Sequence, residues 1–115
     1  MPNSIVYEKS LDFSVRIVNA YKYLTQTKKE YTMSKQLLRS ATSIGANVAE
    51  AQRGQSKADF AAKMNIALKE ASETEYWLQL LHRTDYLSDE QYISLQSDIS
   101  ELLKLLTAIC KSAFS

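Results

Sequence analysis

The side chains that most often do chemistry in proteins are scarce in this sequence. His82 is the only histidine and Cys110 the only cysteine, so neither an internal disulfide nor a metal cluster of Cys and His ligands can form. A Ser–His–Asp site could combine His82 with Asp85, but no strained elbow or oxyanion loop accompanies them. A di-iron bundle needs two Glu-x-x-His motifs, and one histidine is insufficient. We therefore expect no catalytic residue, no metal and no cofactor, and we interpret His82 as a hydrogen-bonded packing residue.

Two other patterns that can accompany catalysis have simpler structural explanations. Glu70, Glu73 and Glu75 form an acidic run, which we interpret as a solvated or interhelical polar strip. Gly45 and Gly54 are isolated, so the sequence contains neither a phosphate-binding loop nor a dinucleotide-binding loop. The sequence thus predicts a protein that is not an enzyme.

Basic side chains give the better functional signal. Four of them are predicted to share one side of a helix and the turn after it: Lys35, Arg39, Arg53 and Lys57. Further lysines alternate with tyrosines around the preceding connection: Tyr21, Lys22, Tyr23, Lys28, Lys29 and Tyr31. Cations bind phosphates, and rings beside them can stack on unpaired bases, so the pattern predicts a nucleic-acid site based on phosphate contacts. Alternatively, Arg39 pairs with Glu50 or with a neighbouring subunit, the tyrosines anchor a protein interface, and the lysines only keep the helix soluble.

The net charge of +1 conceals a gradient along the chain. Residues 1–69 contain 11 basic and 5 acidic side chains, a net charge of +6, whereas residues 70–115 contain 3 basic and 8 acidic side chains, a net charge of −5. Such a gradient either makes one side of the protein attractive to phosphate or is cancelled where antiparallel helices interleave the charges.

Composition and periodicity predict an all-α protein. A chain of 115 residues suits one compact domain, which we expect to span residues 1–115. It is 45% hydrophobic with only two glycines and one proline, which favours long helices over a sheet of many strands. We expect an antiparallel up-down-up-down four-helix bundle. The N-terminus has no signal-peptide pattern and no segment approaches 18 apolar residues in a row, so we expect a cytoplasmic protein without membrane contact.

Polar connections separate the four expected helices. Their expected bounds are Asn3 or Ser4 to Thr27, Ser34 to Gly54, Lys57 to Tyr86, and Ser88 to about Ala113. Ser34, Ser56 and Ser88 are expected to cap the last three helices, and Gly54 to end the second in the left-handed conformation. The core face of the second helix is predicted to consist of Leu37, Ala41, Ile44, Val48 and Ala51.

A second apolar stripe on the first helix cannot be covered by the same core. Leu11, Val15 and Val18 lie nearly opposite the core residues of that helix, so we expect them in a subunit interface, although scattered exposed apolar residues are also normal on monomers. On the second helix Gly45, Ala46 and Ala49 are small enough for close approach of another backbone. Gly45 costs about 1 kcal/mol against alanine in mid-helix, which supports such a packing role.

The chain also shows a family resemblance. The run SIGANVAEAQRGQSKADF, followed by KMNIALKEASETEYWLQLL, resembles the four helix bundle proteins encoded in 23S rRNA intervening sequences, to which the accessory proteins of diversity-generating retroelements are related. The family pattern R-x-x-x-S-I-x-x-N-I-A-E-G is matched by Arg39, Ser43, Ile44, Asn47, Val48, Ala49 and Glu50. The aromatic-led helix that follows is matched at Phe60, Ala71, Ser72 and Glu75. The chain departs from the pattern at Ala51, where the family usually has glycine.

The resemblance implies properties that the residue pattern alone does not. Members are antiparallel four-helix bundles that assemble into rings, commonly pentamers, and no enzymatic activity is implied. The retroelement relatives bind nucleic acid and a reverse transcriptase through basic surfaces. We therefore expect a homo-oligomeric ring that acts as an accessory factor for RNA or DNA, with a protein such as a reverse transcriptase as a further partner. The alternative is a structural or protein-scaffolding oligomer that binds no nucleic acid.

Overall fold

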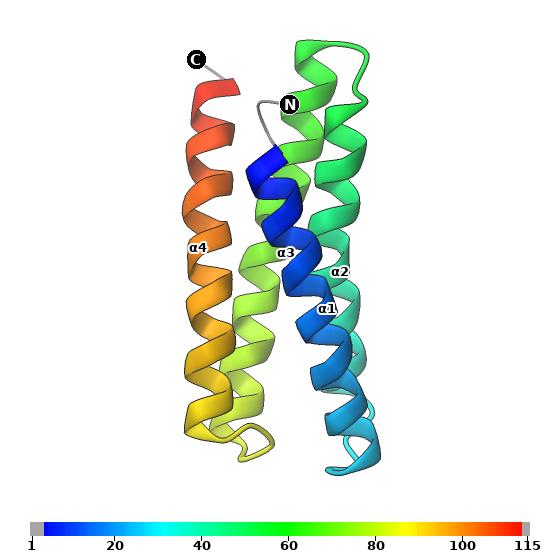
Figure 1. Cartoon of the computed structure of the whole chain (residues 1–115), viewed down its shortest axis with the longest axis vertical. Coiled ribbons are helices and arrows are strands. Elements are labelled where there is room, and N and C mark those ends of the chain that lie inside the picture. Colours follow the sequence, from blue (N-terminus) through cyan, green and yellow to red (C-terminus); the bar gives the residue numbers. More distant parts are fainter. Residues whose placement is uncertain (1–3, 114–115) are drawn as a thin grey trace.

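Four helices account for nearly all of the described chain. The computed structural model describes residues 4–113, and its helices are α1 (Ser4–Gln26), α2 (Met33–Gln52), α3 (Lys57–Arg83) and α4 (Asp89–Ala113). They form an elongated molecule of 44 × 19 × 19 Å. The α1–α2 and α3–α4 turns lie at one end of the long axis and the α2–α3 turn at the other (Figure 1). The predicted all-α class with four helices is confirmed.

The core lies along the axis between the helices. All five residues predicted for the core face of α2 are at most 2% exposed, and Ile17, Leu78 and Leu106 bring α1, α3 and α4 to the same core. Burying each large aliphatic side chain contributes roughly 1.5–3 kcal/mol. The i, i+3, i+4 spacing of these residues is therefore sufficient reason for the helices to pack.

The four helices do not contact one another equally. α2 packs extensively on α1 and on α3, α3 packs on α4, and α1 touches α4 least. Polar contacts bridge this last seam. Arg16 Nη1 lies 2.5 Å from Asp98 Oδ2, Arg16 Nη2 donates to Ser94 Oγ at 2.7 Å, and Lys9 Nζ lies 2.5 Å from Glu101 Oε1. The α1–α4 side thus combines the smallest of the helix contacts with exposed ion pairs across the seam.

Two of the three predicted N-caps are confirmed. Ser56 Oγ accepts the N–H of Asp59 at 3.0 Å, and Ser88 Oγ accepts the N–H of Gln91 at 3.1 Å. Gln91 Oε1 in turn accepts the N–H of Ser88 at 2.8 Å, which completes a reciprocal capping box. Of the two residues expected to begin the first helix, Asn3 lies outside the described residues and Ser4 belongs to α1.

The third cap and the helix ends require corrections. Ser34 does not cap α2, because the helix begins one residue earlier and the side chain of Glu30 caps it instead. Gly54 does not adopt a positive φ, but a Cβ there would lie 3.1 Å from the carbonyl oxygen of Ala51, so the turn would have to shift by a few tenths of an ångström to accept a side chain. α3 ends three residues before Tyr86, because Asp85 turns the chain with a φ of 68°.

Candidate nucleic-acid interface

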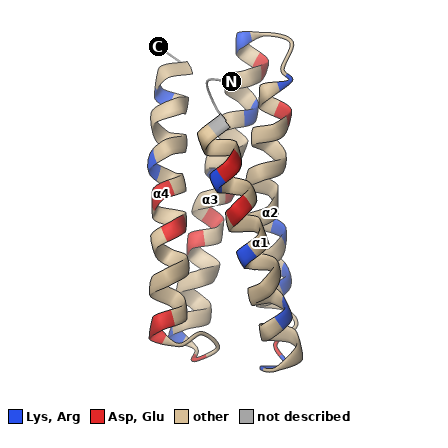
Figure 2. Ribbon diagram, in the orientation of Figure 1, with Lys and Arg blue, Asp and Glu red and all other residues tan. Residues whose placement is uncertain are grey.

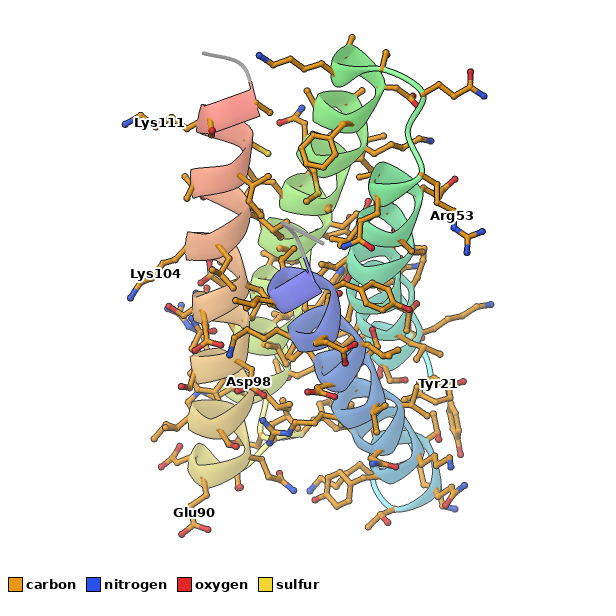
Figure 3. All side chains as sticks on the ribbon, turned by 45° about the horizontal axis from the view of Figure 1, so that its top comes forward. Tyr21, Arg53, Glu90, Asp98, Lys104 and Lys111 are labelled. Carbon is orange, nitrogen blue, oxygen red and sulfur yellow. The ribbon has the colours of Figure 1, made fainter. Side chains whose placement is uncertain are left out.

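The four basic residues predicted to bind nucleic acid do not form one patch. Lys35 and Arg53 point to the same side of α2, but eighteen positions separate them, which corresponds to about 27 Å along a helix. Arg53 points away from the helices near the α2–α3 turn (Figure 3), and Lys57 begins α3 just after this turn. The structure therefore places Arg53 and Lys57 at one end of the molecule and Lys35 at the other.

Arg39, between these two ends, is occupied by acidic side chains of α3. Its guanidinium lies 3.2 Å from Glu70 Oε2 and also forms an ion pair with Glu73. Glu73 Oε2 further accepts the indole N–H of Trp77 at 2.9 Å. The interpretation of the acidic run as an interhelical polar strip is confirmed, whereas the alternative pairing of Arg39 with Glu50 is wrong, since Glu50 faces Lys63 at 3.7 Å. With two carboxylates at its guanidinium, Arg39 has little capacity left for phosphate.

The α1–α2 end of the bundle carries the densest group of unpaired cations. We define the lysine end as the four exposed lysines on and beside the α1–α2 turn: Lys22, Lys28, Lys29 and Lys35. Within residues 4–113 none of the four forms an ion pair. Lys and Arg gather over this part of α1, α2 and their connection (Figure 2). Tyr31, in the same turn, is 60% exposed, whereas Tyr21 and Tyr23 are half-buried.

Glu30 is the one acidic residue of the α1–α2 turn, and its side chain is buried. Its carboxylate accepts the backbone N–H groups of Thr32 at 3.1 Å, Met33 at 3.1 Å and Ser34 at 2.7 Å. Burial raises the pKa of this carboxyl, but the three N–H groups favour its ionised form more strongly and the pKa is lowered overall. The negative charge is therefore held at the N-terminus of α2, where the helix dipole stabilises it.

Sequence reasoning missed the role of Glu30. It assigned the cap to Ser34, a residue type that caps helices most often. In the structure, Ser34 Oγ donates to the carbonyl oxygen of Glu30 at 2.8 Å, which adds to the order of the turn. The available signal was an acidic residue just before a helix otherwise without acidic residues in its first turn. Because the Glu30 carboxylate is buried against the start of α2, it neutralises the lysine end less than its position in the sequence suggests.

The residues predicted for an oligomer interface lie mostly on one surface. Leu11, Gly45, Ala46 and Ala49 line an open groove of about 290 Å³ between α1 and α2, together with Tyr7, Ser14 and Thr42. Val15 and Val18, which are 56% and 36% exposed, extend this apolar surface along α1. The close approach expected at Gly45 occurs within the chain, because a Cβ there would lie 3.3 Å from Ser10 Oγ of α1.

Sites of other kinds receive less support from the geometry. His82 Nε2 lies 2.7 Å from Asp89 Oδ1, and its ring stacks on Tyr92 with 4.2 Å between ring centres, as expected for a packing residue. Between residues 4 and 113 no group of three or more His, Cys, Asp or Glu side chains is placed to hold a metal ion. None of the helices in that range is both long and apolar enough to cross a membrane.

Comparison with known families now identifies the chain. Residues 2–108 match the family model described as 23S rRNA-intervening sequence protein. The chain belongs to this family. Among solved structures it is similar to a crystal structure of a protein of unknown function from the S23 ribosomal protein family of Bacteroides thetaiotaomicron. The two chains are 59% identical with a TM-score of 0.94, over 96% of this chain and 99% of the other. No curated protein matches the chain.

The residues that match the 23S rRNA-intervening sequence pattern are largely explained by packing. Asn47, which is 9% exposed, donates to Ser43 through its side-chain amide at 3.0 Å, and Ile44 and Val48 lie in the core. Arg39 and Glu50 pair with α3, as described above. This pattern therefore joins α2 to its neighbours, and the lysine end lies outside it.

Proposed function

We propose that this member of the 23S rRNA-intervening sequence protein family is a non-enzymatic accessory factor that interacts with nucleic acid through phosphate contacts. It would act as a homo-oligomer of antiparallel up-down-up-down bundles, an order supported by the alternating ends at which the turns lie in Figure 1. The observation that carries the proposal is the lysine end, four exposed cations on and beside a turn whose one carboxylate is buried. Lysines in this state release counterions from nucleic acid on binding.

The geometry makes some of the predicted basic residues better candidates for phosphate binding than others. Lys35 belongs to the lysine end and keeps its predicted role. Arg53 and Lys57 form a smaller second group, with Glu50 and Asp59 nearby in the chain to offset their charge. Arg39 contributes to phosphate binding only if it leaves Glu70 and Glu73. The lysine end is therefore the primary candidate and the α2–α3 turn the secondary one.

Self-association would strengthen weak phosphate contacts. The apolar surface of α1 and the adjoining groove provide a face that a second copy can cover. In a closed ring every protomer has the same relation to the rotation axis, so helices running along that axis would bring all lysine ends to one rim. Several weak sites then act together at high effective concentration. The subunit number, commonly five among the family's rings, follows from the resemblance alone.

The binding proposal is tested by fluorescence anisotropy of a labelled structured RNA and a matched DNA duplex over a range of salt concentrations. With about four phosphates neutralised, log K should fall with log salt with a slope of about −3 to −4. A variant with Lys28, Lys29 and Lys35 changed to Gln should bind at least tenfold more weakly. The matched control changes three exposed lysines elsewhere to Gln: Lys69, Lys104 and Lys111. Equal loss in both variants would mean that only net charge matters.

The competing function is a scaffold that associates with itself or other proteins and binds no nucleic acid. The exposed apolar stripe of α1 favours it, because this surface needs a partner whether or not RNA is present. Val15→Glu should lower the native mass in light scattering while leaving helicity unchanged. Unchanged mass would remove this stripe from the interface. Absence of nucleic-acid binding even at low salt, together with a stable oligomer, would favour the scaffold.

A further inference from the structure

We infer that the lysine end selects single-stranded over double-stranded nucleic acid, with Tyr31 stacking on an unpaired base while the lysines hold neighbouring phosphates. The inference rests on the proposed function and specifies its ligand. It combines three features of the α1–α2 end: an anchored turn, an exposed ring without a partner, and an acidic turn beside it.

The turn that presents these side chains is anchored at its centre. The backbone N–H of Glu30 donates to the carbonyl oxygen of Leu24 at 2.9 Å, and the Glu30 carboxylate is fixed by the N–H groups at the start of α2. Lys29 adopts a left-handed conformation with a φ of 57°. Because Glu30 points inward, its neighbours Lys29 and Tyr31 are directed to solvent, and both are exposed. A ligand would therefore meet a turn that is already ordered.

Tyr31 differs from the other strongly exposed tyrosine. It is 60% exposed, and within residues 4–113 its side chain makes neither a ring contact nor a hydrogen bond. Tyr76, which is 56% exposed, packs edge-to-face on Trp77 with 5.0 Å between ring centres. A free ring flanked by cations is the arrangement that proteins use to bind single strands, since every base offers a face for stacking.

The neighbouring turn makes a duplex the poorer ligand. The α3–α4 turn lies at the same end of the bundle (Figure 1), which measures only 19 × 19 Å across. It carries Asp85, Asp89 and Glu90 against a single nearby cation, Arg83. A duplex carries phosphates on two strands that face different directions, so a rigid duplex seated on the lysines would bring phosphates of its second strand toward these carboxylates. One strand can follow the lysines alone and avoid that repulsion.

The charges also fix where the strand would lie. Glu90 points away from the bundle at the α3–α4 end in Figure 3, so it repels phosphate on that side. No carboxylate other than the buried Glu30 belongs to the stretch between residues 13 and 49. The strand is therefore expected to stay at the α1–α2 end of the bundle, clear of the apolar stripe of α1 and the groove that a second copy would cover.

The experiment compares one labelled RNA of about 12 nucleotides, single-stranded or annealed to its complement, against the parent and three variants. The parent should bind the single strand at least tenfold more tightly than the duplex. Tyr31→Ala should weaken single-strand binding about 5- to 100-fold with little effect on the duplex. Tyr31→Phe, which keeps the ring, should bind like the parent. Tyr76→Ala is the matched control and should also bind like the parent.

The outcomes separate the inference from the proposed function. A parent that binds neither these RNAs nor the DNA duplex at low salt contradicts both. Salt-dependent binding that is as tight for the duplex as for the single strand overturns only the inference, as does Tyr31→Ala binding like the parent. If Tyr31→Ala lowers the oligomer mass instead of RNA affinity, Tyr31 belongs to a protein interface and the inference is also wrong. Circular dichroism of each variant verifies that the exposed position tolerates the change.

Discussion

The α1–α2 and α3–α4 turns lie at the same end of the bundle, yet they use their carboxylates in opposite ways. Glu30 is 8% exposed, and its carboxylate accepts hydrogen bonds from N–H groups at the N-terminus of α2. The side chain of Asp89 is 89% exposed and lies beside His82, while the hydroxyl of Ser88 and the side-chain oxygen of Gln91 cap α4. Both helices start with satisfied N–H groups. One turn is left basic on its surface and the other acidic.

The residue type that caps a helix therefore also affects the electrostatic potential of the surface around the turn. If a serine capped α2, Glu30 would be free to lie among the lysines and neutralise one of them. If one of the carboxylates already in the α3–α4 turn capped α4 in place of Ser88, the turn would expose one negative charge fewer. The net charges of +6 and −5 in the two parts of the sequence therefore do not by themselves show how exposed charge is divided between the two turns.

The largest expected effect comes from removing the buried cap. Glu30→Ala leaves the N–H groups of Thr32, Met33 and Ser34 without their acceptor and should lower the free energy of unfolding by about 2–3 kcal/mol. Urea denaturation followed by circular dichroism measures this loss. The matched change in the other turn, Asp89→Ala, should cost only about 0.5 kcal/mol because its side chain is exposed. Equal costs would contradict the contrast between the two carboxylates.

The same carboxylate should give a specific pH dependence. Its folded-state pKa is lowered from the ordinary 4.5, so its contribution is present above that value and is lost as the pH falls through the lower folded-state pKa. The unfolding free energies of the parent and Glu30→Gln should therefore differ by a constant amount near neutral pH. The difference should shrink below about pH 4.5. A difference that stays unchanged down to pH 3 would show that the charge of Glu30 does not matter.

A smaller loss is expected when the α4 cap is removed. Ser88→Ala removes the acceptor of the Gln91 N–H and should cost about 1 kcal/mol. Unlike the loss from Glu30→Ala, this loss should not depend on pH between 4 and 8, because the hydroxyl does not titrate. Urea denaturation at the two ends of that range tests the contrast. A strong pH dependence would indicate that Asp89 also takes part in the cap.

The smallest effect concerns ligand choice. Asp85→Asn with Glu90→Gln removes two charges from the acidic turn, and asparagine tolerates the left-handed conformation at position 85. Duplex RNA should bind about two- to fivefold more tightly to this variant at low salt, with single-strand binding nearly unchanged. Anisotropy with the two labelled RNAs provides the measurement. An equal gain for both forms would mean that the acidic turn does not discriminate between them.

Local patterns account for what the sequence predicted correctly. The spacing of Leu37, Ile44 and Val48 fixes which side of α2 is buried, since the helical period needs no knowledge of the partner. Ser56 and Ser88 act on N–H groups three residues away, so their role is also local. The exposed stripe at Leu11, Val15 and Val18 follows from the same period.

What the sequence missed depends on which segments meet across helices or turns. The partners of Arg39 are 31 and 34 residues away, and only the register of α2 against α3 brings them together. The burial of Glu30 depends on how the chain reverses between α1 and α2. Periodicity placed Lys35 and Arg53 on one side of α2, but direction around a helix does not show which cations have carboxylates opposite them. Subunit contacts at Ala46 and Ala49 stay a prediction for the same reason.

The sparse seam between α1 and α4 has a consequence for how the bundle opens. Swinging α1 away from α4 breaks the exposed pairs of Arg16 and Lys9 and uncovers core residues such as Ile17, but it parts fewer close backbone positions than separating α2 from α3 does. Amide hydrogens of α1 should therefore exchange with solvent sooner than those of α2. An exchange of first helices between two copies would also part α1 from α2, and it would restore both sets of contacts between the chains. The seam thus leaves the two outer helices of the chain, α1 and α4, as the elements that a domain swap would exchange.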